Sequence, residues 1–155
     1  MKLPFPLKKV HFIGIGGIGM SAIAEMLDDM GVCVQGSNNV ENANTQRLAA
    51  RGIPVFIGHD AGNLNGADSV VISSAIHPDN PEWVEARRRG LSVGHRSEML
   101  AEILRLKQSI CVSGTHGKTT TSSLIAGMMI AGDKKPSFII GGILNAKASN
   151  AQLGK

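Results

Sequence analysis

The chain has 155 residues, of which 43% are hydrophobic and 18% charged, enough for one domain or one domain and part of a second. This composition excludes a disordered chain, and no apolar run reaches the ~20 residues that a membrane-spanning helix needs. The N-terminal segment also lacks the apolar core of a signal peptide. We therefore expect a cytoplasmic protein without membrane contact, in which Cys33 and Cys111 are buried, reduced thiols.

The formal net charge of +4 is unevenly distributed. Residues 1–102 contain nine Lys or Arg and eleven Asp or Glu, a balance of −2, whereas residues 103–155 contain seven and one, a balance of +6. The chain has no Tyr, four Phe and one Trp, too few aromatic residues for a surface on which bases stack. We expect no nucleic-acid partner, and a phosphate site near the C-terminal end explains the basic segment better.

The predicted elements alternate between strand and helix along the chain. Short apolar runs predict strands at 8–15, 32–36, 53–57, 69–73, 91–93, 109–113 and from 138 onward. Apolar residues at helical spacing predict helices at 18–30, 45–51, 81–89, from Ser97 as N-cap, and 118–131. This order predicts an α/β fold with a Rossmann-like, doubly wound, mainly parallel sheet over 1–107. Residues 108–155 would begin a second α/β domain of the phosphate-loop type.

A first glycine loop, GIGGIG, follows the first predicted strand and opens the first predicted helix. Gly14, Gly16 and Gly19 form the GxGxxG pattern, in which the glycines allow a tight turn, close backbone approach to a diphosphate and helix packing. The amides at the helix start would then face the anion. A glycine turn that binds no ligand is the alternative.

The residues at the end of the second predicted strand help to distinguish a dinucleotide site from other nucleotide sites. A dinucleotide site places an acid there for the ribose hydroxyls, but this chain has Ser37 followed by Asn38. The missing carboxylate disfavours an NAD-dependent oxidoreductase, although an asparagine can still bond a hydroxyl or a base edge.

A second glycine loop, GTHGKTT, also lies between a predicted strand and a predicted helix. In such a loop, amides hold the phosphates, Lys118 supplies charge to the terminal phosphate and the Thr119 hydroxyl can bind Mg²⁺. Val112 stands where the strict phosphate-loop pattern has glycine, so the loop is a variant. His116 either contacts a neighbouring segment or faces the ligand.

The segment SSAIHPDNPEW follows the fourth predicted strand, at the sheet edge where doubly wound folds bind ligands. Ser73, Ser74 and His77 offer contacts for an anionic sugar nucleotide, and a capped turn is the alternative. Arg96, just before a predicted helix, is a better ligand candidate than the arginines at 87–89. His11 is predicted to be structural, and His59 and His95 to occupy exposed loops.

Three segments together resemble the Mur ligases: HFIGIGGIGMSAIAEML, VVISSAIHPDNPEW and HRSEMLAEILRLKQSICVSGTHGKTTTSSLIAG. The resemblance extends over essentially the whole chain. It implies a UDP-sugar-binding domain followed by a domain for ATP and Mg²⁺. It also implies ATP-dependent amide formation through an acyl phosphate, with UDP-N-acetylmuramate and L-alanine as substrates of peptidoglycan synthesis.

The resemblance also implies roles for particular residues. The UDP-sugar site would contain Gly14, Gly16, Gly17, Ile18, Gly19, Met20, Ser37, Asn38, Ser73, Ser74, Ala75, Ile76, His77 and Arg96. The ATP site would contain Gly114, Thr115, His116, Gly117, Lys118, Thr119, Thr120 and Asn145. Lys118, Thr119 and His116 would act in catalysis, with Thr119 also binding Mg²⁺.

This chain departs from the family pattern in two respects. Asn38 replaces an acid, and the chain ends at Lys155, before the family's acidic Mg²⁺-binding segment and its C-terminal domain. We therefore expect an inactive N-terminal fragment of a ligase, whose apolar surface after residue 107 can drive self-association. A stand-alone UDP-sugar-binding module is the alternative.

Overall fold

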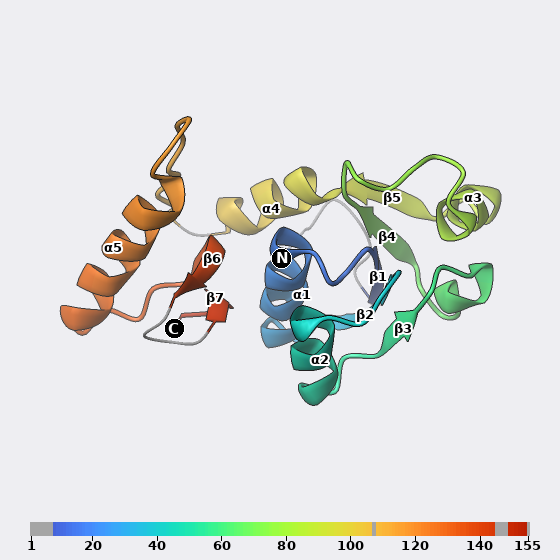
Figure 1. Cartoon of the computed structure of the whole chain (residues 1–155), viewed down its shortest axis with the longest axis horizontal. Coiled ribbons are helices and arrows are strands. Elements are labelled where there is room, and N and C mark those ends of the chain that lie inside the picture. The colour runs from blue at the N-terminus through green and yellow to red at the C-terminus, as the bar shows by residue number, and fades with distance from the viewer. Residues whose placement is uncertain (1–7, 107, 145–148, 155) are drawn as a thin grey trace.

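Five parallel strands form the main sheet of the computed structural model, which describes residues 8–106, 108–144 and 149–154 (Figure 1). The strand order is β3-β2-β1-β4-β5. The strands are β1 (Lys9–Ile13), β2 (Cys33–Asn38), β3 (Val55–Ile57), β4 (Ser69–Ile72) and β5 (Ser92–His95). The connections contain α1 (Ile18–Asp29), α2 (Ala43–Ala50), the 3-10 helix η1 (Ala61–Leu64), α3 (Pro81–Arg88) and α4 (Arg96–Arg105). The predicted doubly wound, Rossmann-like sheet is confirmed.

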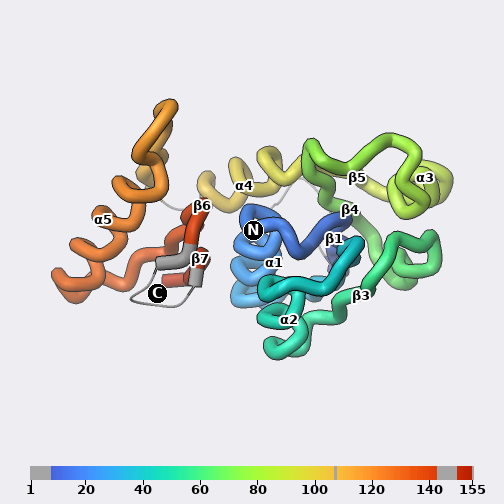
Figure 2. Tube along the Cα trace, in the orientation of Figure 1, coloured from blue at the N-terminus to red at the C-terminus, as the bar shows by residue number. Residues whose placement is uncertain are grey.

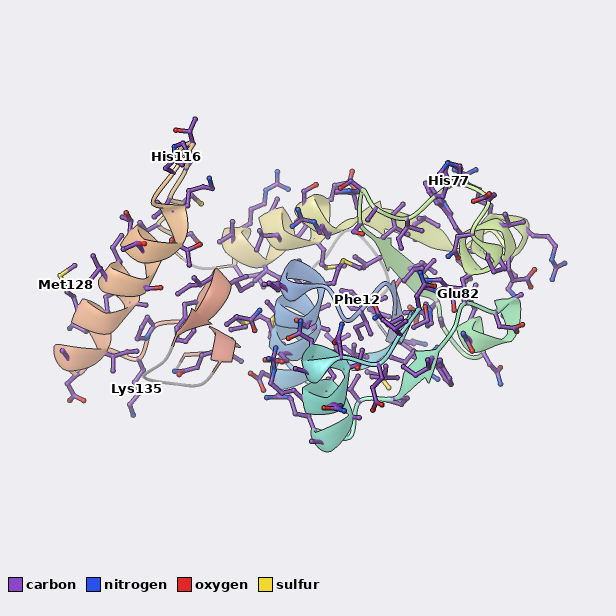
Figure 3. The ribbon with its side chains drawn as sticks, viewed as in Figure 1. Phe12, His77, Glu82, His116, Met128 and Lys135 are labelled. Carbon is purple, nitrogen blue, oxygen red and sulfur yellow. The ribbon has the colours of Figure 1, made fainter. Side chains whose placement is uncertain are left out.

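Both faces of the sheet are covered, because alternate residues of a strand point to opposite sides. Val10 and Phe12 of β1 belong to a core cluster that includes residues of α1 and α4 (Figure 3). Ile13 of β1 and Val70 of β4 belong to a second cluster, on the opposite face, with residues of η1 and α3. Burial on both faces explains why these strands appear in the sequence as short, continuous apolar runs.

The remaining elements lie beside this sheet domain. The helix α5 (Lys118–Ala131) is followed by β6 (Phe138–Leu144) and β7 (Ser149–Gln152), which pair as an antiparallel hairpin. The hairpin lies between α5 and α1, and both of its strands contact α1 (Figures 1 and 2). Ala126, Phe138 and Ile140 form only a small cluster of their own. The hairpin therefore depends on α1 for much of its packing.

The expectations for one strand, for the cysteines and for one helix cap were wrong. Residues 109–113 form no strand, because no neighbouring strand in the described chain supplies hydrogen bonds, and Ile110 is 69% exposed. Both cysteines are exposed, since Cys111 lies in that segment and Cys33 begins β2 at the rim of the sheet. The N-cap of α4 is His95 rather than Ser97, because the helix begins at Arg96.

The strand β7 was not predicted. Its sequence, SNAQ, has no β-branched or aromatic residue, so nothing in its composition favours a strand. None of the helices in the described ranges is long and apolar enough to cross a membrane.

Candidate functional site

A cavity of about 450 Å³ lies at the carboxyl ends of the parallel strands. Its walls come from the segments that follow β1, β2, β3 and β4, and from the start of α4. The strand order reverses between β1 and β4, and ligands of doubly wound sheets bind at this switch point. The lining residues are Gly14, Gly17, Gly19, Met20, Asn38, Asn39, His59, Ser73, Ser74, Ala75, Ile76 and Arg96.

The first glycine loop turns directly from β1 into α1 beside this cavity. Gly14 has φ +81°, a conformation that favours glycine. The N-cap residue of α1, Gly17, provides no side-chain cap. The amides of Ile18, Gly19 and Met20 consequently have no hydrogen-bond acceptor in the described part of the chain. Such amides, at the positive end of the helix dipole, bind anions.

Asparagine side chains fix the middle of the glycine loop. The Gly16 amide donates to Asn38 Oδ1 at 3.1 Å. The Gly16 carbonyl accepts from Asn44 Nδ2 at 2.8 Å and from Asn42 Nδ2 at 3.3 Å. A Cβ atom at Gly16 would lie 2.7–2.8 Å from Asn38 and Asn42. The close approach of these side chains therefore favours glycine here, because a Cβ atom would force Asn38 and Asn42 to move.

The opposite wall follows β4 and the start of α4. Ser73 and Ser74 line the cavity, and the Ser73 Oγ accepts weakly from the Ala75 amide at 3.4 Å. Arg96 reaches the glycine loop, since a Cβ atom at Gly19 would lie 3.0 Å from its Nη1. Two hydroxyls and a guanidinium thus face the free amides across the cavity, an arrangement suited to a phosphate-bearing ligand.

His59 also lines the cavity, contrary to the prediction of an exposed loop position. Its side chain is only 11% exposed, and its Nδ1 lies 2.9 Å from Ser37 Oγ. The hydroxyl of Ser37 donates to Glu82 Oε2 at 2.5 Å, so Nδ1 is the donor in the contact with Ser37. His59 follows β3, and the rule that ligands bind beyond strand ends was the signal that could have identified it.

Glu82 is a fully buried carboxylate beneath this wall of the cavity (Figure 3). It interacts with His11 at 3.2 Å and Asn63 at 2.6 Å, in addition to Ser37. Burial acts to raise the pKa of Glu82, but the hydrogen bonds from His11, Ser37 and Asn63 outweigh it and hold that pKa below its ordinary value. The carboxylate is therefore ionised and satisfied, and His11 has the structural role that was predicted.

The second glycine loop precedes α5 and is exposed throughout (Figure 3). Gly117 has φ +76° and provides no side-chain cap for the helix. Lys118 Nζ donates to the carbonyls of Gly114 and Thr115 within the loop. Thr119 lies against β6, since a Cβ atom at Gly142 would lie 3.0 Å from its Cγ2. A lysine, two threonine hydroxyls and uncapped amides form a set of phosphate ligands.

The family model described as "Mur ligase family, catalytic domain" matches residues 9–108, nearly two thirds of the chain. The chain belongs to the Mur ligase family. This confirms the resemblance that the two glycine loops and the segment after β4 indicated.

Full-length Mur ligases of one type are similar to this chain. The UDP-N-acetylmuramate–L-alanine ligase of Chelativorans sp. strain BNC1 is 54% identical over 155 residues, and that of Azorhizobium caulinodans is 55% identical over 154. The match covers 100% and 99% of this chain but 33% of each relative. The chain thus spans about a third of the length of the curated relatives it matches.

Solved Mur ligase structures share the fold. The UDP-N-acetylmuramate-alanine ligase of Thermotoga maritima has a TM-score of 0.90 and 38% identity, and the match covers 94% of this chain and 35% of that one. The UDP-N-acetylmuramate:L-alanyl-gamma-D-glutamyl-meso-diaminopimelate ligase of Neisseria meningitides has a TM-score of 0.88 and 32% identity, with coverages of 96% and 47%.

Most of the residues predicted for the Mur ligase substrate site come together, and four do not line the cavity. Gly16 is enclosed by asparagines, and Ser37 is buried beneath the cavity. The side chain of Ile18 is 51% exposed. His77 is exposed and bonds Asp79 at 2.8 Å. Asn39 and His59 line the cavity and were not predicted.

Of the predicted ATP-site residues, 114–117 form the loop before α5 and 118–120 form its first turn, whereas Asn145 lies outside the described residues. The two predicted sites of this Mur ligase are well separated. Figure 3 shows His116 at the tip of the loop before α5, and the β6–β7 hairpin lies between α5 and α1, beside whose start the cavity lies (Figure 1).

Proposed function

We propose that this chain carries the UDP-sugar site and the ATP phosphate loop of a UDP-N-acetylmuramate–L-alanine ligase. The observation that carries the proposal is the cavity at the switch point, in which free helix amides face two serines and Arg96. The identity of 54% to ligases of this type supports the choice of substrate. In this proposal the ligase joins the muramoyl carboxylate to the amine of L-alanine as ATP is consumed.

Each wall of the cavity has a part in binding the UDP-sugar. The amides of Ile18, Gly19 and Met20 bind the diphosphate, with Arg96 adding a charged donor from the opposite side. Ser73 and Ser74 offer hydroxyls to the sugar or the diphosphate. Asn38 stands where an acid would bond the ribose, but its Oδ1 accepts from Gly16, which supports a role in holding the loop.

The loop before α5 binds ATP in this proposal. Lys118 must leave the carbonyls of Gly114 and Thr115 to contact the terminal phosphate, and Thr119 provides a hydroxyl to Mg²⁺. Bound there, Mg²⁺ neutralises phosphate charge during transfer. The described residues contain no group of three or more histidine, cysteine or acidic side chains that could hold the metal. We place the domain boundary near residue 107.

Calorimetric titration of the chain with UDP-N-acetylmuramate, ATP–Mg²⁺ and NAD tests the proposal. We expect the UDP-sugar to bind and NAD to show no binding, because the acid that bonds the NAD ribose is absent. Binding of NAD in place of the UDP-sugar would contradict the proposal. If a folded sample binds neither UDP-N-acetylmuramate nor NAD, the first glycine loop is a turn that binds no nucleotide.

Two arginine variants test whether UDP-N-acetylmuramate binds in this cavity. Arg96→Ala removes a side chain that lines the cavity, so we expect UDP-N-acetylmuramate to bind about tenfold more weakly, since charged hydrogen bonds are the stronger ones. Arg88→Ala is the matched control, because Arg88 lies on α3 and pairs only with the exposed side of Glu85. If the two variants bind UDP-N-acetylmuramate with equal affinity, the ligand does not bind in this cavity.

A further inference from the structure

A buried asparagine connects the β6–β7 hairpin to the first glycine loop. Asn150 of β7 is 2% exposed. Its Nδ2 donates to the Ile18 carbonyl at 2.9 Å, and Ile18 is the first residue of α1. One side chain of the hairpin thus holds the helix turn whose amides face the cavity.

A second connection runs through Arg47 of α2. Its Nη2 donates to Asn150 Oδ1 at 3.0 Å, and its Nη1 donates to Asn44 Oδ1 at 3.1 Å. Its Nε donates to the Glu25 carboxylate of α1 at 2.7 Å, which fixes the guanidinium. Asn44 then donates to the Gly16 carbonyl at 2.8 Å. Each of the two asparagine amides therefore uses one donor hydrogen and its oxygen, and the guanidinium of Arg47 uses all three of its nitrogens, within a single network.

The two connections end on the two sides of the loop. One bonds the carbonyl of Ile18, which also accepts from Ser21 Oγ at 3.1 Å, and the other bonds the carbonyl of Gly16. The peptide units that carry the Gly17 and Gly19 amides are thus held, and the unit that carries the free Ile18 amide lies between them. Amides bind an anion best when their directions are set before the anion arrives. The network supplies such preorganisation, and Asn150 of β7 is the member of it that lies outside the sheet domain.

We propose that Asn150 is a positioning residue for the UDP-sugar site, which makes the affinity of the glycine loop depend on the seating of the β6–β7 hairpin. This inference rests on the proposed function for its ligand. The hairpin also contacts α5 through Thr119 and Gly142. The hairpin therefore touches the phosphate loop on one side and the UDP-sugar loop on the other.

The test compares Asn150→Ala with Asn65→Ala in the whole chain. Asn65 is an exposed residue after η1 whose side chain makes no hydrogen bond within the described residues. The readouts are the backbone amide chemical shifts of Gly17 and Gly19 without ligand, and the Kd for UDP-N-acetylmuramate. For Asn150→Ala we expect shifted loop amides and a Kd about tenfold higher, because two buried hydrogen bonds are lost. Asn65→Ala should change neither.

Two further variants keep the test decisive if Asn150→Ala loosens the hairpin. Asn150→Asp keeps the shape and the acceptor for Arg47 but loses the donor to Ile18. Asn44→Ala breaks the other connection without touching the hairpin. We expect Asn44→Ala to raise the Kd less than Asn150→Ala does, because the bond from Asn150 to Ile18 remains. Asn150→Asp should raise it at least as much as Asn150→Ala does, because a carboxylate oxygen then faces the Ile18 carbonyl. Their combination should be non-additive, since both residues belong to one network.

The outcomes separate this inference from the proposed function. Unchanged loop amides and an unchanged Kd in Asn150→Ala would overturn the inference while leaving the UDP-sugar site in place. If the unaltered chain does not bind UDP-N-acetylmuramate, the proposed function fails. In that case, shifted Gly17 and Gly19 amides in Asn150→Ala still support the mechanical connection, and unshifted amides overturn it as well.

Discussion

Gly16 shows how much one position in the site depends on its neighbours. Its amide and carbonyl are held by side chains of Asn38, Asn42 and Asn44, which come from β2 and from the start of α2. The GxGxxG pattern predicted a glycine that lets the backbone approach a diphosphate. In the structure, the space beside Gly16 is filled by asparagine amides, whereas Gly17 and Gly19 line the cavity.

Gly16→Ala should lower the free energy of unfolding by about 1–2 kcal/mol and weaken UDP-N-acetylmuramate binding. The added Cβ displaces Asn38 and breaks its hydrogen bond to the Gly16 amide. Gly127→Ala is the control, because nothing lies within 4 Å of a Cβ there. A helical glycine replaced by alanine raises stability by about 0.5–1 kcal/mol. Denaturant unfolding measures both, and a Gly16→Ala variant as stable as the unaltered chain would contradict the argument.

Glu82→Gln should destabilise the fold by about 2 kcal/mol at pH 7, because the charged acceptor of several buried donors is lost. The folded-state pKa of Glu82 lies below its ordinary value of 4.5, so the carboxylate contributes stability that is complete above that value and declines as the pH falls below it. The difference between the two proteins should therefore shrink in acid. Unfolding at a series of pH values measures it, and a constant difference would exclude an ionised Glu82 as its cause.

Individual cavity residues could be predicted where they belong to a local motif. Gly14, Ser73 and Arg96 stand at the ends of recognisable strands or at the start of a helix. The role of Asn150 could not be predicted in this way, because it depends on Ile18 and Arg47, which are distant in the sequence. Such contacts exist only once the strands are ordered in the sheet.

At the level of the elements, the sequence predicts those whose signals are local. The helices α1, α2 and α3 end near glycines or basic residues where expected, and the strands of the sheet are short apolar runs. The segment 109–113 has the same apolar character, but a strand also needs a neighbour for its hydrogen bonds. The strand β7 is the converse case, since it is polar in sequence and is made a strand by pairing with β6.

The outer face of α5 should make the chain self-associate. Leu124 and Met128, one helical turn apart, are 61% and 66% exposed, and Met128 projects away from the rest of the molecule (Figure 3). Met128→Glu should reduce concentration-dependent association in size-exclusion chromatography, because a charge at an apolar contact is costly. Val84→Glu on α3 is the matched control, since Val84 is also an exposed apolar helix residue. Equal association of both variants would place the contact elsewhere.

At the level of the whole molecule, the β6–β7 hairpin lies between α1, which follows the first glycine loop, and α5, which follows the second (Figure 1). We expect this chain to bind UDP-N-acetylmuramate yet to release no phosphate from ATP when L-alanine and Mg²⁺ are added. The loop before α5 is exposed to solvent, and its Lys118 is engaged by its own loop carbonyls. A phosphate-release assay, with a full-length ligase of the family as positive control, measures this. Release above background would contradict the expectation.

The absence of acidic side chains among the described residues that line the cavity also affects how fast a ligand arrives. Asn38 is neutral, and Arg96 and the helix amides place positive charge at the cavity, whereas the carboxylate of Glu82 is buried beneath it and bonded to His11, Ser37 and Asn63. A diphosphate diffusing nearby is thus drawn in before any contact forms, and dissolved ions weaken this attraction over a screening length of about 10 Å at 0.1 M salt. For the proposed UDP-sugar ligand, we therefore expect the association rate to fall as ionic strength rises.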